Sequence, residues 1–91
     1  MADWFRRETW TQEDEAEFFK KLNRAKKSNR AQYLRIQANH LYETRNRKLL
    51  HIAELLAEKV LTDCADFEFF NIQLAPTYYL LGNIKKELGG K

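Results

Sequence analysis

The chain has 91 residues, of which 44% are hydrophobic and 32% are charged, and it contains only three glycines and one proline. This composition is too apolar for a disordered segment and too poor in turn residues for a fold of many β-strands. A chain of this length buries only about 60–65% of the surface that it exposes when unfolded. We therefore expect one small all-α domain that spans residues 1–91.

The net charge of +3 is unevenly distributed along the chain. Residues 1–19 carry six acidic groups against two arginines, and residues 49–91 carry six acidic groups against four lysines. Residues 20–48 carry ten Lys or Arg against one glutamate. An anionic partner would therefore be sought in this middle third.

A single cysteine, Cys64, excludes an internal disulfide and with it the class of small disulfide-stapled secreted domains. The sequence has no apolar run of the length that a signal peptide or a membrane span requires. We expect a cytoplasmic protein in which Cys64 is a small buried apolar residue.

The first helix is predicted to begin at a capping box, in which Thr11 accepts a hydrogen bond from the backbone of Asp14 and the Asp14 carboxylate reaches back. Acidic residues follow directly and basic residues end the segment, as the helix macrodipole favours. Its apolar stripe is narrow, so residues 1–30 are interpreted as an N-terminal capping segment with one outer helix.

Ser28 and Asn29 are predicted to interrupt the helical pattern before a second helix, residues 30–44. This second helix has a solvated stripe whose members recur every three or four residues: Gln32, Arg35, Asn39, Glu43. The third helix, residues 49–62, is apolar on almost all sides, so we expect it to be the central element.

Residues 63–71 show no clear period and are predicted to be a connecting loop whose phenylalanines cover the core. Pro76 is tolerated in the first turn of a helix, and Gly89 follows the last apolar position, Leu88. These signals predict a fourth helix from about residue 76 to residue 88.

This fourth helix contains Tyr78-x-x-Leu81-Gly82, and Gly89 follows seven residues after Gly82. The run resembles the first helix of a tetratricopeptide repeat, in which a small residue allows a second helix to approach closely. The resemblance implies a degenerate helix pair over residues 31–63, with Ala53 at the crossing, and a terminal first helix over residues 72–89. Lys85 stands where the family has a tyrosine.

Tetratricopeptide repeats bind proteins or peptides in a concave surface lined by their first helices. The resemblance implies a protein partner of unknown identity and places its contacts on six residues: Gln32, Arg35, Asn39, Glu43, Asn83, Lys86. The last helix has apolar residues on more than one side, which leaves three explanations open: it is a terminal cap, it pairs with a second copy or a partner, or the chain is a piece of a longer protein. For the second of these, we expect association, including a homodimer, through Tyr79 and Leu80.

The alternative is an electrostatic nucleic-acid binder that uses the basic segment 20–48. Two patches at opposite ends of the second helix would serve it, with Tyr33 and Tyr42 as stacking surfaces. The simpler interpretation is that these residues end helices and keep a small protein soluble. The patch residues are Arg24, Lys26, Lys27, Arg30, Arg45, Arg47, Lys48.

No motif predicts an enzyme. His40 and His51 fall on different predicted helices without a metal-ligand spacing, and the adjacent Gly89-Gly90 lacks the form of a phosphate loop. Glu54 and Glu58 are expected to be solvated neighbours on one helix, without the separated pKa values that an acid–base pair needs. We therefore expect no catalytic residue, no bound metal and no cofactor.

Overall fold

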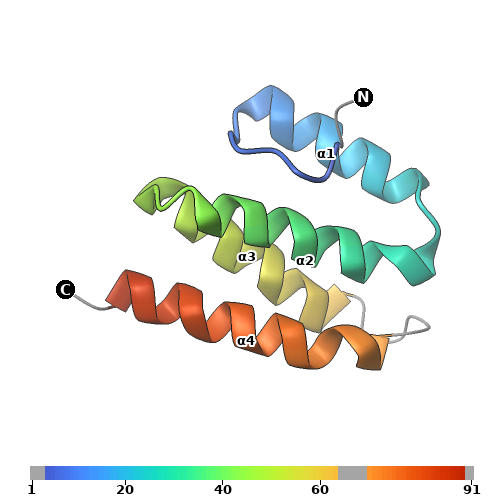
Figure 1. Ribbon diagram of the computed structural model, residues 1–91. Helices are drawn as coiled ribbons and strands as arrows, with labels where there is room; N and C mark the ends of the chain where they lie inside the picture. The colour runs from blue at the N-terminus through green and yellow to red at the C-terminus, as the bar shows by residue number, and fades with distance from the viewer. Residues whose placement is uncertain (1–3, 64–69, 90–91) are drawn as a thin grey trace.

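The computed structural model describes residues 4–63 and 70–89, and this part of the chain contains four helices and no strand (Figure 1). The all-α class is confirmed. Cys64 and the phenylalanines Phe67 and Phe69 of the predicted loop lie outside the described residues. The helices are α1 (Gln12–Arg24), α2 (Lys27–Glu43), α3 (Arg47–Asp63) and α4 (Phe70–Gly89).

Helix α2 packs against each of the other three helices, and α4 packs against α2 and α3. The α1 helix and α4 lie on opposite sides of the α2–α3 pair (Figure 1). The predicted central position of the third helix is therefore shared with α2. The α2 and α4 helices run parallel, because Arg35 in the middle of α2 contacts Gln73 near the start of α4 and Arg45, just after α2, contacts Glu87 near the end of α4.

The core forms where the apolar stripes of the four helices meet. Buried positions recur every three or four residues, so each helix turns one stripe inward. Alanines on α2 and α3 allow the two helices to approach closely, and Ala53 is among them. The core residues are Phe18, Leu22, Ala31, Leu34, Ala38, Leu41, Ala53, Leu56, Ala57, Val60, Leu80, Leu81, Ile84.

The start of α1 follows the sequence prediction. The Thr11 hydroxyl accepts from the Asp14 backbone N–H at 3.0 Å, and the Asp14 carboxylate accepts from the Thr11 backbone N–H at 3.0 Å. The capping box is therefore confirmed, and it satisfies two of the backbone donors that a helix N-terminus leaves unpaired.

The prediction that Ser28 and Asn29 break the pattern is wrong, because both lie in the first turn of α2. The break falls at Ala25, whose extended backbone ends α1. Arg30 donates from Nε to the carbonyl oxygen of Ala25 at 3.2 Å and from its terminal nitrogen to that of Asn23 at 2.7 Å. This side-chain cap from the first turn of α2 allows a two-residue joint that the local composition does not indicate.

The joint between α2 and α3 is shorter than predicted, and α3 begins at Arg47. Arg45 adopts a left-handed backbone with φ of 61°, which ends α2 as a glycine commonly would. The Asn46 side-chain oxygen accepts from the backbone N–H of Lys48 at 2.9 Å and of Leu49 at 3.3 Å. Asn46 is therefore the N-cap of α3.

The prediction that the last helix begins near Pro76 is also wrong, because α4 begins at Phe70 and contains Pro76 in its second turn. Proline lacks an N–H, so the Ile72 carbonyl loses its usual hydrogen bond from residue 76. Both Ile72 and Pro76 are exposed, where water has access to that carbonyl. The helix therefore continues through a proline that would stop it in a buried position.

Thr77 provides a test of the core packing. Its side chain is fully buried, and its hydroxyl oxygen has no hydrogen-bond partner within the described residues. Thr77→Val keeps the shape and removes the unpaired hydroxyl, so we expect the free energy of unfolding to rise by about 1 kcal/mol. Ile84→Val, at a fully buried position two turns later, should lower it by about 1 kcal/mol.

Urea denaturation of the two variants and the parent chain measures both changes. A fall in stability for Thr77→Val would mean that the Thr77 hydroxyl has a hydrogen-bond partner in solution, and would contradict the conclusion that it is unpaired.

Candidate functional site

The predicted groove residues lie on the parallel helices α2 and α4, and three of the six make contacts within the protein. Arg35 donates from Nε to the Gln73 side-chain oxygen at 2.6 Å, and burial lowers the pKa of the Arg35 guanidinium. Asn39 donates to the Glu43 carboxylate at 3.3 Å, one turn later on α2. Gln32 is exposed. The α2 side of the groove is therefore largely paired within the protein.

The α4 members of the groove belong to a different surface. Asn83 is half-buried and Lys86 is exposed. Tyr79 follows Ile72 by seven residues, Asn83 follows Tyr79 by four, and Lys86 follows Asn83 by three. These helical spacings place the four residues on one strip of the helix. This strip borders the outward side of α4, which packs on α2 and α3 with its other side.

The outward side of α4 combines small residues with large exposed apolar ones. Ile72, Tyr78 and Tyr79 are 64%, 59% and 75% exposed, which is unusual for three large apolar side chains on one helix. Helical spacing places Ala75 and Gly82, two turns apart, between these flanks. We call this surface the α4 outer face and define it as Ile72, Ala75, Tyr78, Tyr79, Gly82, Lys86.

The predicted association face needs one correction. Leu80 is only 5% exposed and belongs to the core, so it takes no part in an exposed face, whereas Tyr79 lies on the α4 outer face. The helical period explains the difference, because Leu80 lies one turn before the fully buried Ile84. Tyr78 and Ile72 occupy the exposed positions instead.

Gly82 has open space around it. A Cβ atom built on this residue would meet no heavy atom within 4 Å, and its backbone angles are helical. The sequence predicted a close approach of another helix at this glycine, but within the described chain nothing approaches it. Lys85, where the tetratricopeptide pattern has tyrosine, instead donates to Glu54 at 2.8 Å and lies 3.6 Å from Glu58 on α3.

Three arginines of the predicted nucleic-acid patch are used inside the protein. Arg30 caps the end of α1, Arg47 donates to the carbonyl oxygen of Leu88 near the end of α4 at 2.8 Å, and Arg45 pairs with Glu87 at 3.2 Å. Cations at helix C-termini stabilise the exposed carbonyls and the macrodipole. All members except the half-buried Arg30 are exposed on the surface, and four of them make no side-chain hydrogen bond or ion pair with the described residues: Arg24, Lys26, Lys27, Lys48.

The patch residues form two groups at opposite ends of α2, which as a helix of 17 residues is about 25 Å long. The expected stacking surfaces are also occupied. Tyr33 packs against Trp4 and Phe5 with ring centroids 5.1 and 4.6 Å apart, and the Arg45 guanidinium lies 5.2 Å from the centre of the Tyr42 ring. No observation therefore favours the nucleic-acid alternative.

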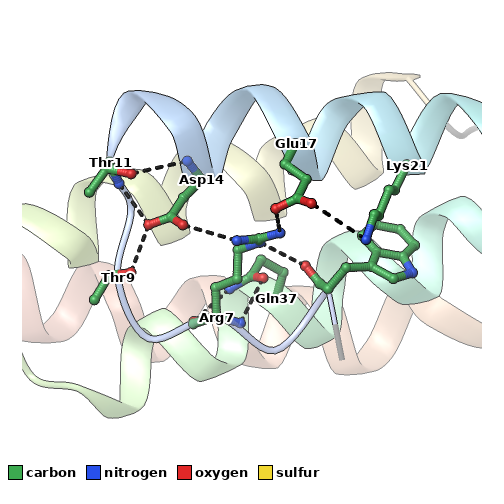
Figure 2. Close-up of polar contacts among 8 residues, drawn as sticks. Arg7, Thr9, Thr11, Asp14, Glu17, Lys21 and Gln37 are labelled. Atoms are coloured by element: carbon green, nitrogen blue, oxygen red, sulfur yellow. Dashed lines mark hydrogen bonds and ion pairs between the residues drawn. The ribbon is translucent and has the colours of Figure 1, made fainter. Parts of the chain in front are cut away.

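A second surface, which the sequence did not predict, lies at the N-terminus. Residues 4–10, here called the N-terminal strap, run between α1 and α2 (Figure 2). The side chain of Gln37 on α2 is fully buried and pairs with the backbone of Arg7 in both directions. Its oxygen accepts from the Arg7 N–H at 3.0 Å, and its nitrogen donates to the Arg7 carbonyl at 2.8 Å.

The Arg7 side chain connects the strap to α1. Its terminal nitrogens donate to the Asp14 carboxylate at 2.9 Å and to the Glu17 carboxylate at 2.7 Å, while Nε donates to the Trp4 carbonyl at 3.0 Å (Figure 2). The Arg7 guanidinium bonds lower the pKa of Glu17. The one sequence signal for this site was a polar residue, Gln37, on the buried stripe of α2.

Aromatic rings of the strap pack against rings on both α1 and α2. Trp4 packs against Phe18 and Tyr33 with ring centroids 5.3 and 5.1 Å apart, and Trp10 packs against Phe18 at 5.4 Å and Phe19 at 6.4 Å. Such tilted and edge-to-face pairs are favourable beyond the area that they bury. The strap is therefore held by rings, by the Gln37 amide and by two carboxylates.

The two histidines considered for catalysis lie on different helices. His40 on α2 is half-buried and His51 on α3 is exposed. Among the described residues, no three His, Cys, Asp or Glu side chains are placed to hold a metal ion. In the same part of the chain, no helix is long and apolar enough to cross a membrane. Comparison with protein-family models, curated proteins and solved structures finds no match to this chain.

The Asp14 carboxylate predicts how stability depends on pH. The Thr11 backbone N–H, the Thr9 hydroxyl and the Arg7 guanidinium lower the pKa of Asp14 in the folded protein. Its stabilisation is therefore complete above the unfolded pKa of about 3.9 and is lost as the pH falls through the lower folded value. Asp14→Asn should cost about 1 kcal/mol at neutral pH, and this difference should shrink below about pH 4.

Urea denaturation of both chains between pH 7 and pH 2 measures this difference. Glu13→Gln, an exposed charge removal in the same helical turn, is the matched control and should have a smaller effect. If the difference in free energy of unfolding between Asp14→Asn and the parent chain does not change with pH, the conclusion that the folded protein lowers the pKa of Asp14 is contradicted.

Proposed function

We propose that this chain is a non-enzymatic protein–protein interaction module of the tetratricopeptide-like kind, and that its partner packs against the α4 outer face. The observation that carries the proposal is the arrangement of Ile72, Tyr78 and Tyr79 around Gly82. Three exposed apolar side chains flank a glycine that has open space above it. Aromatic residues of this kind are enriched at protein interfaces, and contiguous apolar patches often mark them.

Gly82 is the strongest part of this argument. A glycine inside a helix costs about 0.5–1 kcal/mol relative to alanine, because the unfolded chain loses more freedom on folding. No contact within the described chain uses the missing side chain at Gly82. A second helix that approaches closely between the flanking tyrosines would use it.

The order of the helices supports the tetratricopeptide-like interpretation. The α2 and α4 helices run parallel, with α3 between them in the chain, as expected for a helix pair followed by the first helix of a next repeat. Among the described residues, α4 packs on α2 and α3 with one side, and no helix packs on the α4 outer face. A partner helix would pack there.

Only some of the six predicted groove residues fit this binding surface. Lys86 belongs to the α4 outer face and Asn83 borders it, so both would contact the partner, whereas Arg35, Asn39 and Glu43 are already paired within the protein. We place the protein in the cytoplasm on the sequence grounds given above. A second copy of the chain is the other occupant that this face could accept.

Gly82→Leu separates binding from folding. Leucine has a high helix propensity and its Cβ meets no neighbour, so we expect the free energy of unfolding to rise by about 0.5–1 kcal/mol. The same side chain fills the space that the partner helix needs, so partner capture should be lost. The measurement is a nuclease-treated pull-down from the native cell extract with the parent chain and the variant, compared by quantitative mass spectrometry.

Ala16→Leu is the control, since Ala16 is an exposed small residue on the far helix α1 and should not affect capture. Equal capture by the parent chain and by Gly82→Leu would exclude the α4 outer face as the binding surface. Recovery of nucleic acid alone, lost after nuclease treatment, would instead favour the basic segment. A doubled molecular mass that Gly82→Leu abolishes would identify a second copy as the partner.

A further inference from the structure

The N-terminal strap lies in a groove whose contacts are those of a peptide-binding site. Two hydrogen bonds join the Gln37 side chain to the backbone of Arg7: the Arg7 N–H donates to the Gln37 oxygen, and the Gln37 amide nitrogen donates to the Arg7 carbonyl. This is how a strand or an extended peptide is recognised when the side chain is not read. The amide that makes both bonds is fully buried in α2 and is held in place by the core around it.

The remaining contacts read side chains. Trp4 and Phe5 both pack on Tyr33, and Trp4 also packs on Phe18, so the groove accepts two adjacent aromatic residues. Two positions further on, a guanidinium fits between the carboxylates of Asp14 and Glu17 at 2.9 and 2.7 Å. Charge-assisted bonds of this geometry select arginine over a neutral residue.

We infer that the groove between α1 and α2 binds a partner's extended segment with two adjacent aromatic residues and an arginine two positions after them, and that the protein's own strap occupies it as an intramolecular competitor. The carboxylates of Asp14 and Glu17 favour a basic partner segment over an acidic one. The tether is short, because the strap ends one residue before the Thr11 cap of α1.

Such a tether sets a high effective concentration for the strap. A short link gives an effective concentration in the millimolar range, so a free segment of the same chemistry competes only weakly with the closed groove. Binding from solution is reduced by the fraction of molecules in which the groove is open. The strap therefore acts as an autoinhibitory element, and its release should increase affinity for the free segment.

Arg7→Glu in the full chain provides the release. The substitution places a third carboxylate beside Asp14 and Glu17, so the strap is repelled while Gln37, Phe18 and Tyr33 remain. The ligand is a fluorescent peptide with the sequence of residues 4–10, and binding is measured by fluorescence anisotropy. We expect the Arg7→Glu chain to bind this peptide at least about tenfold more tightly than the parent chain does.

Three comparisons make the result specific. Arg24→Glu, the same charge change on the exposed end of α1, should bind the peptide no better than the parent chain. Adding Gln37→Ala to Arg7→Glu should abolish binding, because the backbone contacts are lost. A peptide with Glu at the position of Arg7 should not bind. Failure of the Arg7→Glu chain to bind the peptide while its helical circular dichroism is unchanged would overturn the proposal.

A second measurement avoids any substitution. If the strap opens alone, the Arg7 amide, which donates to Gln37, exchanges its hydrogen faster than the amide of a core residue such as Leu41 in the parent chain. Equal protection of the two amides would mean that the strap opens only on global unfolding, and would overturn the proposal. A parent chain that dimerises while Arg7→Glu binds no peptide would assign the groove to a second copy and overturn the assignment to a partner.

Discussion

A buried amide on α2 sets the constraint from which the N-terminal half is built. Gln37 is fully enclosed, and an unpaired amide in such a position would cost about 1–3 kcal/mol or more. The backbone of Arg7 pairs with it in both directions and so holds the strap across α2. The strap then brings Trp4 and Trp10 onto the rings of α1, and the Arg7 guanidinium pairs with its carboxylates. Helix α1 is therefore attached to the core in two ways: through its own narrow apolar stripe and through the strap.

Helix ends in this protein are closed by cations from other elements. Arg30 reaches the last carbonyls of α1, and Arg47 reaches a carbonyl in the last turn of α4. Together with the contacts of Arg35 and Arg45, they account for four of the ten basic residues in the middle third without a nucleic-acid partner. The α4 outer face has no comparable internal explanation, because Gly82 and the exposed tyrosines contribute little to the fold that contains them. The two proposed binding surfaces thus lie on opposite sides of the α2–α3 pair, one open on α4 and one occupied between α1 and α2.

The parts of the fold that were predictable depend on short-range signals. The Thr11–Asp14 capping box and the periodic stripes required only neighbouring residues, so the start of α1 and the number of helices followed from them. The errors occurred where a side-chain contact or the exposure of a residue in the packed protein changed a local preference. Arg30 allows a two-residue joint at Ala25, and the exposure of Pro76 lets α4 continue through a proline. Leu80 and Tyr79 are neighbours in an apolar run, and only the packing of α4 on α2 and α3 determines which of them is buried.

The sequence by itself determined the all-α class, the helical stripes and the positions of most charges, because these depend on composition and on a period of 3.6 residues. It also indicated that the last helix carries more apolar surface than a neighbour could cover. The tertiary structure decided which polar groups are paired inside the protein: Arg35 with Gln73, Asn39 with Glu43, and Gln37 with the backbone of Arg7. Two of these three pairs join residues that are far apart in the chain, and no local sequence pattern predicts that they lie close together in the fold. Which surfaces remain for a partner was therefore determined only by the packed helices.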